Sequence, residues 1–138
     1  MSEEELDALW SHFGHRAFRP GQEAIVAAVL RGRDVLAVMP TGSGKSLGYQ
    51  LPAVMLPGLT LVVSPLISLM KDQVDELNRR GIASGALHSM LSIDGRSEVL
   101  RAVKARHLRL LYVAPERFAS HQFLQLLGTL EVAPFIVD

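Results

Sequence analysis

The chain has 138 residues, a length typical of one domain, and it is 49% hydrophobic and 20% charged. These proportions exclude a disordered, collagen-like or coiled-coil chain. Basic and acidic residues both number 14, so no global charge attracts nucleic acid or a membrane surface. The lack of cysteine excludes disulfides, thiolate zinc sites and a cysteine nucleophile. The acidic start and the short apolar runs predict an intracellular protein with no signal peptide and no membrane span.

Two helices are predicted before residue 34. Ser2 is a suitable N-cap, three glutamates follow it, and Gly14 ends the pattern. The apolar residues at helical spacing are Leu6, Leu9, Trp10 and Phe13. We interpret Trp10 as a core residue rather than a platform for a base. A second helix is predicted to begin near Pro20, which suits the first helical position, and to end at Gly32.

Short apolar runs alternate with helical patterns in the rest of the chain. The runs lack polar alternation, which favours strands buried on both faces. They cover residues 35–39, 60–64, 83–87, 110–114 and 135–138, and the helical patterns cover 45–55, 65–80 and 92–106. This alternation implies right-handed crossovers and a parallel sheet with helices on both faces. The predicted fold class is therefore α/β.

A glycine-rich loop stands between the first predicted strand and the helix that follows it. Its residues are Met39, Pro40, Thr41, Gly42, Ser43, Gly44, Lys45 and Ser46. Two glycines let successive backbone N–H groups point at an anion, and the helix dipole adds positive charge. Lys45 would reach the β and γ phosphates of a nucleotide, and the Ser46 hydroxyl would bind Mg²⁺. The general phosphate-loop pattern has glycine where this chain has Met39.

Other distinctive residues follow predicted strands directly. They are Met39-Pro40, Ser64-Pro65, Ala114-Pro115-Glu116 and Asp138. Ligands of open parallel sheets bind beyond the carboxyl ends of the strands, so we expect these residues to gather at one edge. Asp138 follows three apolar residues, which is how phosphate-loop ATPases present the aspartate on the Mg²⁺ side.

Arg19 and Gln22 lie upstream of the glycine-rich loop. The amide of Gln22 can pair with one donor and one acceptor, the combination that the edge of adenine offers. On composition alone, Gln22 is a solvated helix residue.

Taken together, these segments resemble the RecQ family of DNA helicases. The similarity runs from about Leu9 to Asp138, and its motifs keep the family's order and spacing. They are Phe13-Gly14, Phe18 to Gln22, Gly32 to Gln50, Val63 to Gln73, and Leu111 to Arg117.

The resemblance implies a RecA-like phosphate-loop NTPase fold. Residues 1–33 would be a helical adenine-binding segment that includes His15, Arg19 and Gln22. Residues 34–138 would be the first motor lobe, truncated at the start of the family's Asp-Glu-Ala-His box. The implied activity is ATP- and Mg²⁺-dependent unwinding of DNA in the 3′-to-5′ direction, with roles in DNA repair and recombination.

The resemblance also assigns functional residues and partners. Lys45 and Asp138 would act in catalysis, and Ser46 and Asp138 would hold the metal. Residues 64–73 and 114–116 would lie on the path of single-stranded DNA beside the duplex. The cell compartment would be the nucleoid region in a bacterium or the nucleus in a eukaryote.

Several departures from the family pattern have consequences. His15 stands where the family usually has tyrosine, and Ser43 replaces a third glycine of the loop. The glutamate expected after Asp138, the second lobe with its arginine finger, and the family's zinc and winged-helix parts are not in this sequence. We therefore expect this chain to bind ATP and to hydrolyse it poorly.

Two other functions compete with the DNA helicase hypothesis. One is an RNA helicase lobe of the DEAD-box class. Against it, that class carries Pro-Thr-Arg-Glu-Leu where this chain has Ser64 to Ser68. The third hypothesis is a catalytically silent nucleotide-binding module that regulates a partner. The five histidines show no metal-ligand spacing, so we expect no zinc. The basic side chains of Lys104, Arg106 and Arg109 could contact a phosphate backbone, but a charge run at the end of a helix is usually a solvated face, and we favour that interpretation.

Overall fold

The computed structural model describes residues 2–37 and 44–138, except for the side chain of Ala133. The chain forms two compact parts, Met1–Leu56 and Pro57–Asp138. The predicted boundary between an adenine-binding segment and a motor lobe at residues 33 and 34 stays a prediction.

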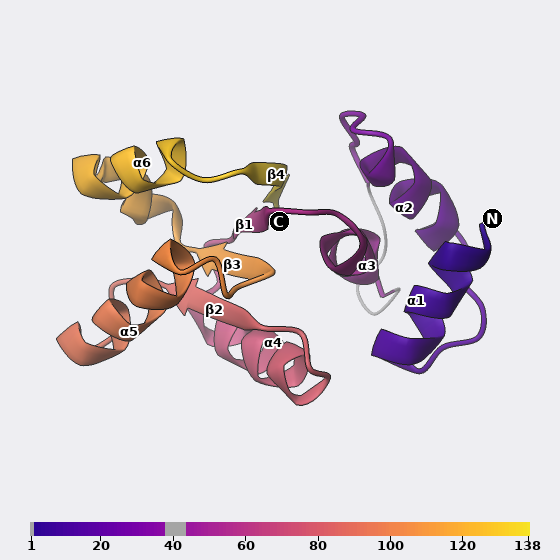
Figure 1. Cartoon of the computed structure of the whole chain (residues 1–138), viewed down its shortest axis with the longest axis horizontal. Coiled ribbons are helices and arrows are strands. Elements are labelled where there is room, and N and C mark those ends of the chain that lie inside the picture. Colours follow the sequence, from indigo (N-terminus) through magenta and orange to yellow (C-terminus); the bar gives the residue numbers. More distant parts are fainter. Residues whose placement is uncertain (1, 38–43) are drawn as a thin grey trace. The chain divides into compact units, whose positions relative to one another are not determined.

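The described residues of the first part form the helices α1 (Glu3–Phe13), α2 (Gln22–Leu30) and α3 (Leu47–Met55) (Figure 1). Ser2 and Glu5 form a reciprocal capping box at the start of α1, as the sequence pattern favours. α2 and α3 pack closely through Gly48, where an added Cβ would lie 2.6 Å from the Cγ2 atom of Ile25. Any larger residue at position 48 would therefore push the two helices apart.

The second helix begins later than predicted. Pro20 lies in a turn, and Gly21 is the N-cap of α2 with a left-handed φ of 87°. That backbone conformation cannot belong to a helical turn, so the helix starts at Gln22.

The interpretation of Trp10 as a core residue is wrong. Leu9 and Phe13 are buried four residues apart on the inner side of α1, whereas Trp10 is 53% exposed. One residue corresponds to about 100° around a helix, so Trp10 falls outside the narrow buried stripe. The Arg16 guanidinium lies over its ring, 4.8 Å from the centroid, which is a cation–π arrangement.

The strand predicted at residues 35–39 is not observed in the part of it that the structure describes. Residues 35–37 have no strand assignment, and Leu36 is 92% exposed. An apolar run becomes a strand only where a neighbouring strand satisfies its backbone hydrogen bonds, and these three residues enter no ladder. Residues 38 and 39 lie outside the described residues.

The second part confirms the predicted parallel sheet. Its strands are β1 (Leu59–Val63), β2 (Ser84–Leu87), β3 (Leu110–Val113) and β4 (Val132–Val137). Within the described residues the spatial order is β2-β3-β1-β4, and every pair is parallel. The intervening helices are α4 (Ile67–Arg79), α5 (Ile93–Lys104), the 3₁₀ helix η1 (Pro115–Ala119) and α6 (His121–Gly128).

Helices cover both faces of this sheet. On one face, Leu61 and Leu111 pack with Val103 of α5 and Phe123 of α6 in a single buried cluster. The strand pleat turns Tyr112 to the opposite face, where its hydroxyl reaches Gln73 of α4. The fold class is therefore α/β with a helix-covered parallel sheet, as predicted.

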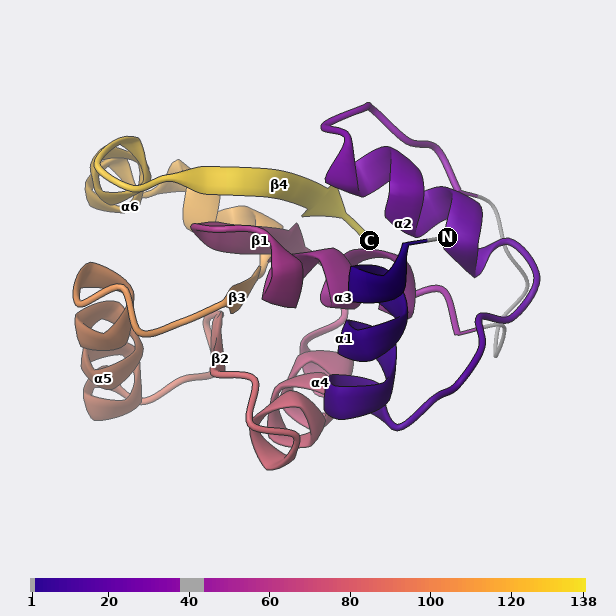
Figure 2. The same cartoon turned by 45° about the vertical axis from the view of Figure 1, so that its right-hand side comes forward.

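β4 is longer than the predicted run and contains a proline. Figure 2 shows β4 beside β1, and their register shifts by one residue between the pairs Leu59–Val132 and Leu61–Phe135. Pro134 lies within this shift. Since proline has no N–H to donate, such a bulge lets the strand continue through it.

The end of α5 holds the one described non-glycine residue with a positive φ, Arg106 at 57°. The N–H of Arg106 donates to Val103 O and the N–H of His107 donates to Ala102 O, both at 3.0 Å. This pair of bonds is the Schellman motif, in which glycine usually occupies the left-handed position. Arginine at this position therefore carries conformational strain.

We predict that Arg106→Gly raises the free energy of unfolding by about 0.5–1 kcal/mol, because glycine adopts the left-handed conformation without strain. Chemical denaturation of both proteins measures the change. Arg101→Gly is the matched control, since Arg101 is exposed inside α5. That control should lower stability by about 1 kcal/mol, and equal effects of the two substitutions would contradict the account.

Candidate nucleotide-binding site

Gln22 connects the segment before α2 to the end of the glycine-rich loop. Its side chain is only 4% exposed. The Oε1 atom accepts a hydrogen bond from the Arg19 N–H at 2.8 Å, and the Nε2 atom donates to the Gly44 carbonyl at 2.9 Å. The interpretation of Gln22 as a solvated residue is therefore excluded, and two segments 22 residues apart are held together by one amide.

Gly44 is required by this contact. Its φ is +77°, and an added Cβ would lie 2.6 Å from Nε2 of Gln22 and 3.6 Å from Nη1 of Arg19. A side chain at position 44 would thus strain the backbone and displace Gln22. The structure brings Arg19, Gln22 and Gly44 together.

Lys45 and Ser46 form the turn that leads into α3. The Leu47 N–H donates to Gly44 O at 3.3 Å, and the Gln50 N–H donates to Ser46 O at 2.9 Å. Ser46 is the N-cap of α3, yet its side chain makes no capping hydrogen bond. Its hydroxyl oxygen is thus not consumed by the helix, and the exposed Lys45 stands beside it in sequence.

Of the other residues predicted to contact the nucleotide, the structure describes His15. His15 is exposed after α1, and its backbone N–H donates to Leu9 O. Met39, Pro40, Thr41, Gly42 and Ser43 lie outside the described residues.

The carboxyl ends of the strands in the second part meet at one edge, as predicted. The Ser64 N–H donates to Val113 O at 3.1 Å, the Ala114 N–H donates to Leu87 O at 3.0 Å, and the Asp138 N–H donates to Val63 O at 2.8 Å. Asp138 is exposed at the end of β4. Residues from three predicted motifs therefore share this edge.

The Tyr112 hydroxyl donates to Oε1 of Gln73 at 2.7 Å, a link that the sequence did not predict. Tyr112 is buried in β3, directly before residues 114–116, and Gln73 lies in the segment 64–73. The sequence does contain a signal for this hydrogen bond, because Gln73 lies among the apolar residues that form the inner stripe of α4. A polar side chain there needs a buried partner.

The outer face of α4 carries exposed ion pairs. Lys71 pairs with Asp75 at 2.6 Å, and Glu76 pairs with Arg79 at 2.7 Å. The hydrogen bond from Arg79 holds the pKa of Glu76 below its usual value. These exposed pairs contribute little to stability.

Among residues 2–37 and 44–138, no group of three or more histidine, aspartate and glutamate side chains is placed to hold a metal ion. No helix in these ranges is long and apolar enough to cross a membrane.

We predict that Gln22→Ala lowers the free energy of unfolding by about 1–3 kcal/mol, because the partly buried Gly44 carbonyl and Arg19 N–H lose their partner and the buried amide leaves a space. Gln122→Ala is the control, since Gln122 is exposed on α6. Urea denaturation followed by circular dichroism compares the two variants. If the two variants had the same free energy of unfolding, the hydrogen bonds of Gln22 would contribute nothing to stability.

Comparisons with known proteins agree with the geometry. A family model described as DEAD/DEAH box helicase matches residues 19–138. "ATP-dependent DNA helicase RecQ" of Haemophilus influenzae is 47% identical over 96% of this chain and 22% of its own length. The protein of the same name from Pasteurella multocida is 44% identical over 100% of this chain and 22% of its own length.

A solved structure, titled as a hypothetical ATP-dependent RNA helicase from Sulfolobus tokodaii, superposes with a TM-score of 0.71. The alignment covers 99% of this chain and 41% of that one, at 20% identity, so the likeness shows the fold alone. The chain spans 22% of the length of the two RecQ relatives. The resemblance to RecQ helicases is confirmed, and the chain belongs to the DEAD/DEAH box helicase family.

Proposed function

We propose that this chain is the first motor lobe of a RecQ-type DNA helicase that couples ATP hydrolysis to 3′-to-5′ unwinding. The observation that carries the proposal is the extent of the similarity. Identity of 44–47% to proteins named ATP-dependent DNA helicase RecQ covers nearly the whole chain. The matched region therefore includes the glycine-rich loop, the Gln22 segment and the carboxyl edge of the sheet.

Gln22 has the hydrogen-bonding capacity to recognise adenine while it holds Gly44. A side-chain amide offers two N–H donors and two oxygen lone pairs. The contacts with Arg19 and Gly44 use one of each. The second pair matches the N7 acceptor and the N6 donor of adenine, so base recognition and the loop contact are compatible. Arg19 would lie next to the same base.

The residues of the loop and of β4 fit a Mg²⁺-nucleotide by their chemistry. Lys45 supplies a compact cation for the β and γ phosphates, close to the positive end of the α3 dipole. The Ser46 hydroxyl and the Asp138 carboxylate are hard oxygen ligands of the kind that Mg²⁺ prefers. When bound, the ion would neutralise charge that develops on the phosphates. Ser46 and Asp138 would hold it, and Lys45 would orient the γ phosphate.

The carboxyl edge of the sheet supports a path for single-stranded DNA. Segments 64–73 and 114–116 both begin there, and the Tyr112–Gln73 hydrogen bond fixes one against the other. Leu66 and Leu69 are 54% and 49% exposed at the start of α4. Apolar side chains there give bases a surface on which to stack, while backbone N–H groups meet phosphates.

The names of the relatives favour DNA over RNA as the polynucleotide. Every curated relative described above is named a DNA helicase, whereas the structure titled as an RNA helicase shares only the fold. We place the protein inside the cell, with DNA. A silent regulatory module remains the competing function, and the following experiments separate it from a motor lobe.

We predict that Lys45→Ala weakens Mg²⁺-ATP binding at least about tenfold, because the phosphates lose a charge-assisted hydrogen bond. Isothermal titration calorimetry on the 138-residue chain measures the affinity. Lys104→Ala, which removes an exposed lysine on α5, is the control and should bind ATP like the wild type. Equal ATP affinity in the Lys45→Ala protein would refute the phosphate-loop assignment.

We also predict that the 138-residue chain binds ATP without DNA-stimulated hydrolysis. The chain spans 22% of the length of its RecQ relatives, and the water-orienting glutamate and the arginine finger that the resemblance implies are not among its 138 residues; loss of an arginine finger alone costs about 10³–10⁵ in rate. A phosphate-release assay with and without single-stranded DNA measures turnover, and the full-length H. influenzae relative is the positive control. Robust DNA-stimulated turnover by this chain would show that the catalytic groups have been misplaced.

A further inference from the structure

A cavity of about 530 Å³ lies at the amino-terminal edge of the sheet, where the strands begin. Three connections form it, and they lead into β1, β3 and β4. Since the strands are parallel, this edge is opposite to the one that carries Ser64, Ala114 and Asp138. The cavity is therefore separate from the residues to which the proposed function assigns roles in this part of the chain.

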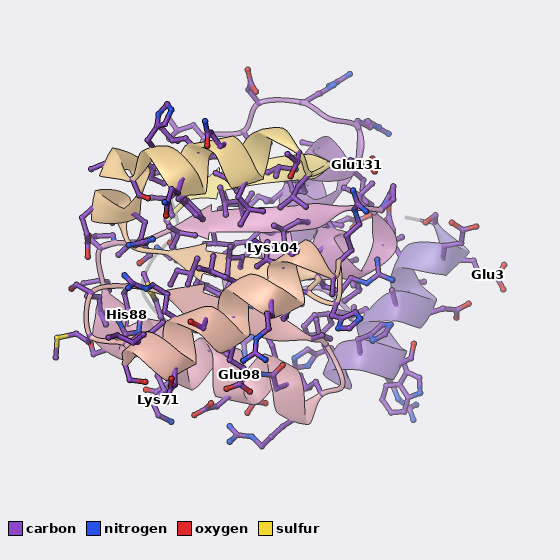
Figure 3. The ribbon with its side chains drawn as sticks, turned by 60° about the vertical axis from the view of Figure 1, so that its left-hand side comes forward. Glu3, Lys71, His88, Glu98, Lys104 and Glu131 are labelled. Carbon is purple, nitrogen blue, oxygen red and sulfur yellow. The ribbon has the colours of Figure 1, made fainter. Side chains whose placement is uncertain are left out.

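The lining combines an apolar wall with a charged rim. Leu59, Leu108 and Leu130 supply apolar surface, and Arg106, His107 and Glu131 supply the polar groups, with Arg109 also present. Figure 3 labels Glu131 just before β4, and Lys104, which does not line the cavity, on α5. Polar and apolar groups contribute comparably to this lining, and concave sites of about this volume are typical of small-molecule binding.

Arg106 is presented from a fixed backbone. The Schellman bonds to Val103 and Ala102 hold residues 106 and 107 at the cavity, and Arg106 keeps a φ of 57° that glycine would adopt more easily. Strained residues cluster at functional sites, and Arg106 lies in the lining of this cavity. The guanidinium of an arginine at this position can donate paired hydrogen bonds to a carboxylate or a phosphate.

We propose that this cavity binds a small organic anion with an apolar body, such as an aryl or alkyl carboxylate or phosphate ester. Arg106 and the ring of His107 hold the anionic group, and the leucines cover the apolar body. The carboxylate of Glu131 on the same rim repels a second negative group, so the site favours ligands with one anionic end. This ligand class is distinct from Mg²⁺-ATP, which has a highly charged triphosphate.

The test uses 2-naphthoate as the probe and its neutral analogue 2-naphthylmethanol, titrated into the 138-residue chain by calorimetry. We expect saturable binding of 2-naphthoate with a dissociation constant on the order of 1 mM or tighter. The neutral analogue should bind at least about fivefold more weakly, because it lacks the charge that Arg106 pairs with. Amide shifts in NMR spectra should be centred on Gly58, His107 and Glu131.

Three variants test which side chains determine the affinity for 2-naphthoate. Arg106→Gly should weaken 2-naphthoate at least about fivefold while raising the melting temperature, so lost binding would not reflect lost folding. Glu131→Gln should tighten binding, because a like charge is removed. Lys104→Ala, an exposed cation outside the cavity, should leave binding unchanged.

The proposal is overturned if 2-naphthoate shows no saturable binding at about 10 mM. It is also overturned if Arg106→Gly and Lys104→Ala have the same affinity, if the neutral analogue binds equally well, or if the shifted amides lie away from the cavity. Binding that competes with Mg²⁺-ATP and is lost in Lys45→Ala would place the probe at the phosphate loop and contradict the proposal as well.

Discussion

The two hydrogen bonds of the buried Gln22 amide are the interaction on which the proposed nucleotide site depends. They connect the turn before α2 to Gly44, the residue that precedes Lys45 and Ser46. Loss of either bond would leave a polar atom of the buried Gln22 side chain without that partner, which costs about 1–3 kcal/mol, so the loop end is expected to stay where Gln22 holds it. The residue proposed to read the base thus also positions the residues proposed to bind the phosphates.

This arrangement has a consequence for specificity. A base that lacks the groups matching the remaining donor and acceptor of Gln22 leaves those buried polar atoms unpaired, which is how sites reject close analogues. Because Gln22 also contacts Gly44, a poor fit at the base end would disturb the phosphate end. In the proposed site, base identity would therefore be tied to the geometry of the loop.

The parallel register divides the chemistry of the second part between two edges. All four strands point the same way, so motif residues that follow strands meet at the carboxyl edge. The connections that precede β1, β3 and β4 meet at the other edge and form the cavity with Arg106. One edge serves the proposed motor function, and the other is available for a separate ligand without competition.

Patterns local in sequence predicted most of the fold. The parallel strands and α4 follow from apolar runs and helical spacing, which depend on residues close together in the chain. Such patterns failed where a distant partner decides the outcome. The run at 35–37 looks like a strand but joins no ladder, and Trp10 has helical spacing but lies outside the buried stripe of α1.

The short helix α6 and the bonds between distant residues were not predictable for a related reason. α6 has eight residues, too few for a clear period, and it follows a proline-led turn. The links from Gln22 to Gly44 and from Gln73 to Tyr112 span 22 and 39 residues. A polar residue in an apolar stripe signals that a partner exists, but only the tertiary structure identifies it.

The most direct test of the central claim is an NMR titration of the isotopically labelled chain with Mg²⁺-ATP and with Mg²⁺-GTP. The account predicts saturable ATP binding in which the side-chain amide of Gln22 and the backbone amides of Arg19, Gly44 and Lys45 shift together. GTP should bind more weakly, with a smaller change at the Gln22 amide. Equal binding of both nucleotides with the Gln22 amide unmoved would contradict the claim that this residue joins base recognition to the phosphate loop.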